Sequence, residues 1–215
     1  MDTAPPQAPE GTRQALILAG IRLFGGQGFA ATSVRQLAQE AGANIAAIAY
    51  HFGGKDGLRL ACAEEFGRRM SGAIGAVQPE PGDSPDAARE GLRQIIRRMV
   101  AFLLHGPGST EIVPFMLREL AEAGPGIDTV YRSFAEPMHR RLCQLWGQAT
   151  GRDPESDSVR LAVFALVGQL MYFRIGQPIV QRRMDWDGIG PVEIDQITRR
   201  IICNLDAMLD HEQGG

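Results

Sequence analysis

The chain has 215 residues, of which 44% are hydrophobic and 22% charged, and its formal net charge is −3 at pH 7. This composition is typical of a globular protein with a substantial core, and it excludes a wholly disordered chain and a uniformly basic nucleic-acid coat. The cysteines Cys62, Cys143 and Cys203 are too widely spaced to form a metal-ligand motif. We therefore expect no metal site, no cofactor, and reduced thiols in a cytoplasmic protein.

Residues 1–11 are rich in Pro, Ala and Gln, and they contain neither a basic cluster nor an apolar segment. This pattern predicts a disordered tail and not a signal peptide. The longest apolar run, Leu161–Val167, is far shorter than the roughly 20 residues that a bilayer-spanning helix needs. We therefore expect no membrane partner.

Apolar residues recur at helical spacing along nearly the whole chain, and no useful strand alternation is present. The sequence therefore predicts an all-α fold of about nine helices, with a kink at Pro137. The expected helices cover residues 12–27, 33–41, 44–52, 55–77, 85–105, 110–123, 127–150, 155–176 and 192–209.

Residues 33–52 show how two of these helices begin and how they are joined. Ser33 and Gln36 form the S-x-x-Q pattern of a capping box, and Asn44 is a favourable N-cap for the helix that follows. Gly42 permits a left-handed turn between the two helices. Two short helices joined in this way are typical of a helix-turn-helix, whose second helix enters a DNA major groove. Residues 13–55 also contain four basic residues and a single acidic one, Glu40, in an otherwise acidic chain.

The segment FAATSVRQLAQEAGANIAAIAYHFGGKDGL, from Phe29 to Leu58, resembles the DNA-binding domain of TetR-family repressors. The amino-acid sequence of this segment from Ala41 onward, together with Met116–Leu120 and Val167–Pro178, resembles the CecR-like branch of that family. The resemblance implies a helix-turn-helix domain at residues 12–54. It also implies a C-terminal effector-binding and dimerisation domain at residues 55–215.

The resemblance also implies a set of DNA contacts. Ala49 departs from the family, which often has an aromatic residue there, so we expect the recognition helix to read thymine methyl groups and DNA shape. Simpler interpretations remain open, in which Arg35 is a solvated arginine, Tyr50 packs on the first helix, His51 caps a helix and Lys55 only begins one. The implied phosphate contacts are Thr32, Ser33, Tyr50, His51 and Lys55, and the implied base contact is Arg35. Asn44, Ile45 and Ala46 lie at the start of the recognition helix, where it enters the groove.

An apolar pocket with a few polar groups is expected in the C-terminal part, as is usual for small-molecule sites. Arg118 is the polar candidate for an anionic effector, and a salt bridge with Glu119 or Glu122 is the competing interpretation. The candidate effector residues are Phe102, Phe115, Arg118, Phe134, Trp146, Gln169 and Tyr172.

The last two long expected helices are apolar around much of their circumference, which favours pairing with a second copy in a four-helix bundle. The candidate interface residues are Leu161, Phe164, Ala165, Gly168, Ile197, Ile201, Leu205 and Met208. The resulting hypothesis is a homodimeric repressor that binds a pseudo-palindromic double-stranded DNA operator and is released by a small-molecule effector. Two alternatives remain: a helical protein-interaction module without operator specificity, and an all-α enzyme that uses the apolar pocket.

Overall fold

The computed structural model describes residues 10–75, 84–106 and 108–213, and these residues contain helices and no strand, which confirms the all-α expectation. The described chain forms two compact units. Unit 1 comprises Met1–Arg69 and Thr110–Ser133, and unit 2 comprises Met70–Ser109 and Phe134–Gly215. Unit 1 therefore extends beyond the expected boundary at residue 54 and includes a second, distant segment of the chain. Most of the expected tail, residues 1–9, lies outside the described residues, whereas Glu10 and Gly11 belong to the first helix.

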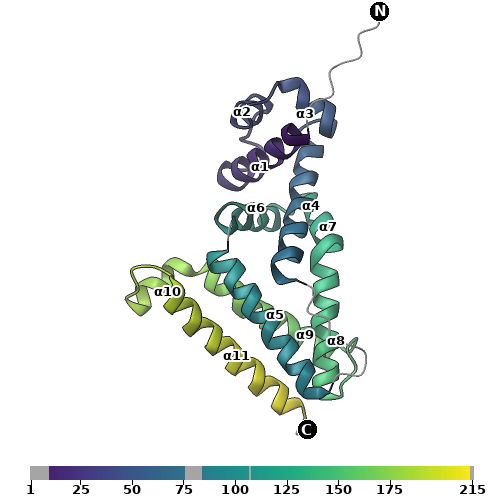
Figure 1. Cartoon of the computed structure of the whole chain (residues 1–215), viewed down its shortest axis with the longest axis vertical. Helices are drawn as coiled ribbons and strands as arrows, with labels where there is room; N and C mark the ends of the chain where they lie inside the picture. Colours follow the sequence, from purple (N-terminus) through teal and green to yellow (C-terminus); the bar gives the residue numbers. More distant parts are fainter. Residues whose placement is uncertain (1–9, 76–83, 107, 214–215) are drawn as a thin grey trace, which may run out of the picture. The chain divides into compact units, whose positions relative to one another are not determined.

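Unit 1 is built around the helix-turn-helix, with α1 packed against α2 and α3 (Figure 1). Its core is formed by side chains that the apolar periodicity places on inward faces, including Leu16, Ile21, Leu37, Ile48 and Leu58. The helices of this unit are α1 (Glu10–Gln27), α2 (Val34–Glu40), α3 (Ile45–Phe52), the first part of α4 (Lys55–Ile74), α6 (Ser109–Ala121) and α7 (Gly126–Val130).

The expected capping residues begin and end α2 and α3. The Ser33 hydroxyl accepts a hydrogen bond from the backbone N–H of Gln36, whose side chain accepts one from the backbone N–H of Ser33. Asn44 Oδ1 accepts the N–H of Ala46 at 3.0 Å, and Gly42 turns the chain between the two helices with φ of 61°. The local sequence therefore fixes where these helices begin and where the chain turns between them.

Unit 2 is a helical bundle in which α5 packs against α8, α9 and α11 (Figure 1). Leu92, Ile96, Trp146, Leu166 and Leu205 are among the side chains that fill its core. The helices of this unit are α5 (Pro85–His105), α8 (Glu136–Thr150), α9 (Asp157–Ile175), α10 (Gln177–Met184) and α11 (Pro191–Gln213).

The number of helices differs slightly from the expected nine. In the described residues α7 and α8 join through a π-helical turn, η1 (Tyr131–Ala135), into one continuous helix, which leaves ten continuous helices. The tenth is α10, whose Pro178 stands in the first turn, where a proline costs no helical hydrogen bond. The sequence predicted a kink at Pro137, and the structure has the π turn, which ends two residues before it. Proline provides no N–H for the preceding turn, which is a reason for irregular helical hydrogen bonding there.

Candidate DNA-binding site

The outer face of α3 presents small and apolar side chains to solvent. Ile45 is 51% exposed and Tyr50 is 58% exposed, and Ala46 and Ala49 between them are exposed as well. Ile48 points inward and is buried, which holds the helix onto α1 and α2. Because the exposed alanines are small, the backbone of α3 can approach a groove closely, and Ile45 offers an apolar contact at the helix entry.

The positive charges near α3 differ in how far they are already neutralised. Arg35, on α2, is exposed and has no hydrogen bond or ion pair with any described residue. By contrast, Arg22 Nε lies 2.9 Å from Glu40 Oε1, so its charge is balanced within the protein. Arg35 is therefore the freer guanidinium of the two, and its planar fork suits a guanine edge or a phosphate.

Lys55 and His51 lie around the junction of α3 and α4. The Lys55 ammonium lies 4.1 Å from the centre of the Phe29 ring, and the Arg59 guanidinium lies 4.4 Å from the same ring. Phe29 therefore holds two cations near the start of α4, where backbone N–H groups and the helix dipole also attract anions. This role of Phe29 could not be predicted from the sequence, because a cation–π pair has no fixed spacing in the sequence.

His51 does not act as the cap of α3, because that position is taken by Gly53, whose N–H donates to the carbonyl of Ala49. The ring atom Nε2 of His51 is buried and has no hydrogen-bond partner among the described residues. The histidine side chain is therefore not committed to the alternative structural role considered from the sequence.

Thr32 departs from its expected position at the DNA surface. Its side chain is 1% exposed, and its hydroxyl donates to the carbonyl of Gly28 at 2.7 Å and accepts from Gln27 Nε2 at 3.1 Å. The structure therefore places Thr32 as an internal brace of the turn after α1, so its side chain is not presented to a phosphate. Ser33 and Asn44 are exposed, but their oxygens already cap α2 and α3.

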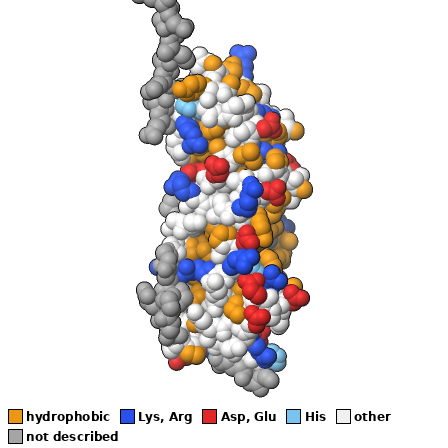
Figure 2. All heavy atoms as spheres, turned by 90° about the vertical axis from the view of Figure 1, so that its right-hand side faces the viewer, with side chains coloured by type: hydrophobic (Ala, Val, Ile, Leu, Met, Phe, Trp, Pro, Cys, Tyr) orange, Lys and Arg blue, Asp and Glu red, His pale blue; other side chains and the backbone are white. Residues whose placement is uncertain are grey.

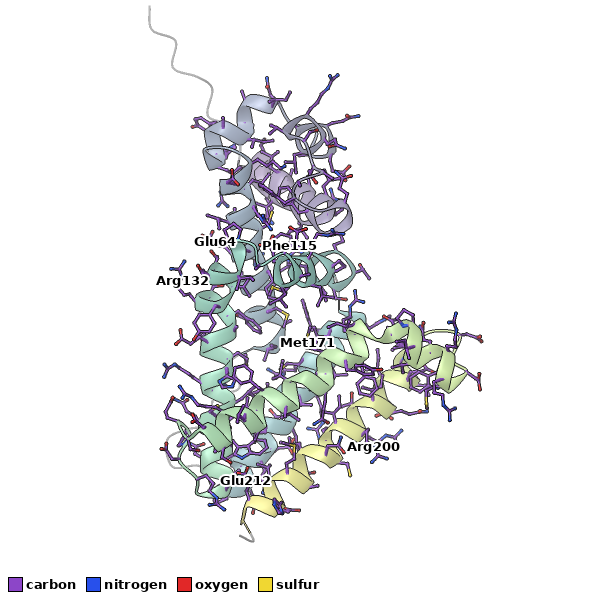
Figure 3. All side chains as sticks on the ribbon, turned by 180° about the vertical axis from the view of Figure 1, so that it is seen from behind. Glu64, Phe115, Arg132, Met171, Arg200 and Glu212 are labelled. Carbon is purple, nitrogen blue, oxygen red and sulfur yellow. The ribbon has the colours of Figure 1, made fainter. Side chains whose placement is uncertain are left out.

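Arg118 and Phe115, two of the expected effector contacts, lie in unit 1, where α6 packs on α1. Arg118 donates to the carbonyls of Gly25 and Gly26 at 3.3 and 3.2 Å, which caps the C-terminal end of α1. A Cβ atom on Gly25 would lie 2.9 Å from the backbone nitrogen of Phe115, so the two helices approach closely. Phe115, which belongs to α6, is buried (Figure 3). Both residues therefore join α6 to the helix-turn-helix.

The other expected effector residues are not brought together in unit 2. Trp146 is fully buried, and its Nε1 donates to Glu212 Oε2 at 2.8 Å at the end of α11 (Figure 3). Gln169 accepts from Asn204 at 2.8 Å, which joins α9 to α11. Phe102 is buried, whereas Tyr172 is exposed. Of the seven residues, only Phe134 lines a cavity that also contains a cation without a partner among the described residues. That cation is Arg141, which the sequence did not single out.

The expected dimer residues fall into two groups. On α9, Leu161 is 67% exposed, Phe164 is 60% exposed, and Ala165 and Gly168 on the same face are exposed too. On α11 the expectation needs correction, because Ile197, Ile201 and Leu205 are buried in the core of unit 2 and Met208 is half-buried. The exposed side of α11 instead carries residues such as Ala207 and Arg200, whose side chain projects from the helix (Figure 3).

Comparisons with known proteins identify two families that match parts of this chain. The tetR family of bacterial regulatory proteins matches residues 16–62, and the C-terminal domain of the HTH-type transcriptional dual regulator CecR matches residues 88–211. The dual regulator CecR of Shigella flexneri is 31% identical over 209 residues, which cover 93% of this chain and 92% of that protein.

Solved structures show the same fold. A TetR-like transcriptional regulator from Rhodococcus sp. RHA1 superposes with a TM-score of 0.65 and 22% identity, over 91% of this chain and 94% of the other. AibR, solved in complex with isovaleryl coenzyme A and operator DNA, superposes with a TM-score of 0.65 and 17% identity, over 89% and 96% of the two chains.

Proposed function

The chain belongs to the tetR family of bacterial regulatory proteins, with a C-terminal domain of the CecR type, and from this premise we propose how it acts. It is a helix-turn-helix transcriptional regulator and not an enzyme. It binds a pseudo-palindromic operator as a homodimer and leaves it when a small apolar or amphipathic effector binds. The observation that carries this proposal is the exposed outer face of α3, with its small side chains, together with the nearby Arg35, which has no hydrogen bond or ion pair with any described residue.

The contacts of this site divide into those that position the protein and those that read sequence. Tyr50, His51 and Lys55 contact phosphates on one side of the groove and set the register of α3. Arg35 and Ile45 meet base edges, through a guanidinium fork and an apolar contact with a thymine methyl group. Sequence preference therefore depends on few polar contacts, and groove shape contributes the rest.

Dimerisation uses the exposed apolar stripe of α9. Leu161, Phe164 and Tyr172 lie on this stripe, and large exposed apolar patches of this kind mark interfaces. By length and composition alone, α9 also meets the requirement for a membrane-spanning helix, with a mean hydropathy of 1.4. The short apolar run Leu161–Val167 in the sequence did not indicate this. We assign the stripe to a second protomer in the cytoplasm, because two protomers match the two half-sites of an operator.

Effector response is transmitted through α6. This helix follows α5 of unit 2 directly along the chain, and Arg118 and Glu119 fasten it to α1 and α4 inside unit 1. An effector that binds one arrangement of α6 more tightly than the other shifts the population between a DNA-binding and a released form. Typical coupling free energies of about 1–3 kcal/mol correspond to changes of about 5- to 150-fold in operator affinity.

Fluorescence anisotropy on DNA upstream of the protein's own gene tests the proposal, with random DNA as the control and a series of salt concentrations. We expect clear preference for the upstream DNA, and weaker binding by Lys55→Ala and His51→Ala, with the slope of log affinity against log salt reduced by about 0.9 for a lost phosphate contact to lysine. Arg199→Ala, on the exposed face of α11, is the matched control for lost charge. Equal, weak, salt-driven binding to upstream, genomic and random fragments would support the protein-interaction module instead.

A further inference from the structure

Arg141, on α8, carries a guanidinium group with unmet hydrogen-bonding capacity. Its Nε and Nη2 atoms are buried and have no hydrogen-bond partner in the described part of the chain. Burial lowers the pKa of this guanidinium. A buried donor without a partner costs free energy, and the cost is higher for a charged group, so such an arginine calls for an explanation.

The same side chain lines a cavity of about 470 Å³ within unit 2, and the cavity volume falls in the range of small-molecule sites. Its described lining contains two arginines and no acidic residue. The lining residues are Ser71, Gly75, Phe134, Pro137, Met138, Arg140, Arg141 and Gln144. An anion therefore meets net positive charge, Phe134, Pro137 and Met138 offer apolar surface, and Ser71 and Gln144 offer polar groups.

The neighbouring Arg140 differs from Arg141 because its charge is already balanced. Arg140 lies 3.3 Å from Glu136 and 3.2 Å from Glu155, and Glu155 is also paired with Arg160. Figure 2, which faces the side of α7 and α8, shows acidic and basic side chains lying next to one another over the lower part of unit 2. Glu136 and Glu155 therefore neutralise Arg140 and Arg160, while Arg141 has no partner among the described residues.

A larger groove of about 1250 Å³ lies between α5 and α11, and its charged lining residues, unlike Arg141, have partners within the protein. Each carboxylate in its lining has an arginine partner: Asp195 pairs with Arg199, Asp206 with Arg93 and Asp210 with Arg89. Its charges are therefore satisfied within the protein, and nothing in the groove selects one class of occupant.

We propose that the Arg141 cavity binds a small amphipathic monocarboxylate, with the guanidinium of Arg141 turned toward the carboxylate and the apolar tail against Phe134, Pro137 and Met138. This proposal rests on the proposed function, because it names the chemical class of the effector. A carboxylate accepts two parallel hydrogen bonds from a guanidinium, which removes the penalty of the unmet donors. The one unpaired cation in the described lining matches a single negative charge.

Isothermal titration calorimetry on the full chain tests this site with two probes, 4-phenylbutyrate and octanoate, and their uncharged primary amides. We expect the carboxylates to bind the wild type more tightly than the amides. Arg141→Met should weaken carboxylate binding by about 10- to 150-fold and leave amide binding nearly unchanged, since hydrogen bonds to charged groups have that worth. Arg140→Met, which removes a charge that is already paired, should change either affinity by less than about threefold.

Absence of binding by both carboxylates would overturn the proposal, as would unchanged carboxylate binding by Arg141→Met or a loss confined to Arg140→Met. Thermal unfolding without probe gives an independent readout. We expect Arg141→Met to melt at or above the wild-type temperature, because an apolar side chain removes unmet donors. A clearly lower melting temperature would show that Arg141 is structural and would overturn the proposal.

Operator binding, measured separately with and without 4-phenylbutyrate, keeps this proposal distinct from the proposed function. Arg141-dependent carboxylate binding with unchanged operator affinity would support the site and contradict its role as the effector site. Arg141-dependent carboxylate binding by a protein that prefers no operator would support the site and contradict the DNA-binding function.

Discussion

Arg59 on α4 and Glu119 on α6 form an ion pair inside unit 1, with Arg59 Nε 2.5 Å from Glu119 Oε1, although 60 residues separate them in the sequence. Both side chains are more than nine-tenths buried. The other carboxylate oxygen of Glu119 accepts the backbone N–H of Gly126 at 3.2 Å, and the Arg59 guanidinium lies over Phe29. This pair therefore fastens α6 and the start of α7 to the helix-turn-helix.

Loss of either partner should destabilise unit 1 strongly. For Arg59→Met and for Glu119→Gln we expect the free energy of unfolding to fall by about 3–5 kcal/mol, because each change leaves a buried group without its partner. Urea denaturation followed by circular dichroism measures the effect. Arg199→Met removes an exposed pair with Asp195 and should cost no more than about 1 kcal/mol. Equal, small losses in all three variants would contradict a structural role for the buried pair.

Two glycines of α4 should respond in opposite directions to replacement by alanine. A Cβ atom on Gly57 would overlap the carbonyl oxygen of Phe52, whereas a Cβ on Gly72 would meet no described atom within 4 Å apart from its chain neighbours and its own helix backbone. We expect Gly57→Ala to destabilise the protein by about 1–3 kcal/mol and to weaken DNA binding, because the α3–α4 junction must shift. Gly72→Ala should stabilise it by about 0.5–1 kcal/mol. Thermal unfolding and anisotropy compare the two, and a stable, fully DNA-binding Gly57→Ala variant would refute the steric argument.

Features of the helix-turn-helix that depend on neighbouring residues could be predicted from the sequence. The capping box of Ser33 and Gln36 and the N-cap Asn44 each act within three residues of their own position, and both are confirmed. Helical periodicity likewise located the buried faces of most helices. The short α10 was not expected, because Gly176 and Pro178 indicate a chain break as readily as a helix start.

Features that depend on contacts distant in the sequence could not be predicted. Arg118 has the chemistry of an anion-binding residue, but it bonds to carbonyls of α1 that lie more than 90 residues away. Arg141 has the same side chain and no sequence signal of its own, and only the fold shows that no described residue bonds to its Nε and Nη2 atoms. Similarly, the apolar residues of α11 have the same spacing whether they pack in the protomer's own core or against a second copy. The structure places Ile201 and Leu205 in the core.

The three cysteines should differ in reactivity. Burial raises the pKa of the Cys62 thiol, and the carboxylates of Glu119 and Glu65 add to the effect, while burial also raises the pKa of Cys143. Cys203 is exposed. Because the thiolate is the reactive form, we expect a chromogenic disulfide reagent at pH 8 to label one thiol rapidly in the folded protein and three in urea. Cys203→Ser should abolish the rapid phase, and a rapid phase that persists in this variant would contradict the assignment.

Stability at acidic pH should depend on Glu65. Burial of this carboxyl tends to raise its pKa, but hydrogen bonds from Arg68 and Arg69 outweigh burial, and the pKa lies below its ordinary value of 4.5. A carboxyl whose pKa is lower in the folded than in the unfolded state stabilises the fold above the unfolded pKa, and this stabilisation is lost as the pH falls through the folded pKa. We therefore expect the free energy of unfolding of the wild type to fall as the pH drops below about 4.5.

Urea denaturation between pH 6 and pH 3 measures this loss. Glu65→Gln should be less stable than the wild type at pH 6 and should lose less stability on acidification, since its side chain does not titrate. Glu64, the neighbouring residue on α4 (Figure 3), is exposed, so Glu64→Gln is the matched control and should follow the wild-type curve. If the Glu65→Gln curve ran parallel to that of the wild type, the acid sensitivity would have to arise from other carboxylates, and the pairing of Glu65 with Arg68 and Arg69 would contribute little to the stability of unit 1.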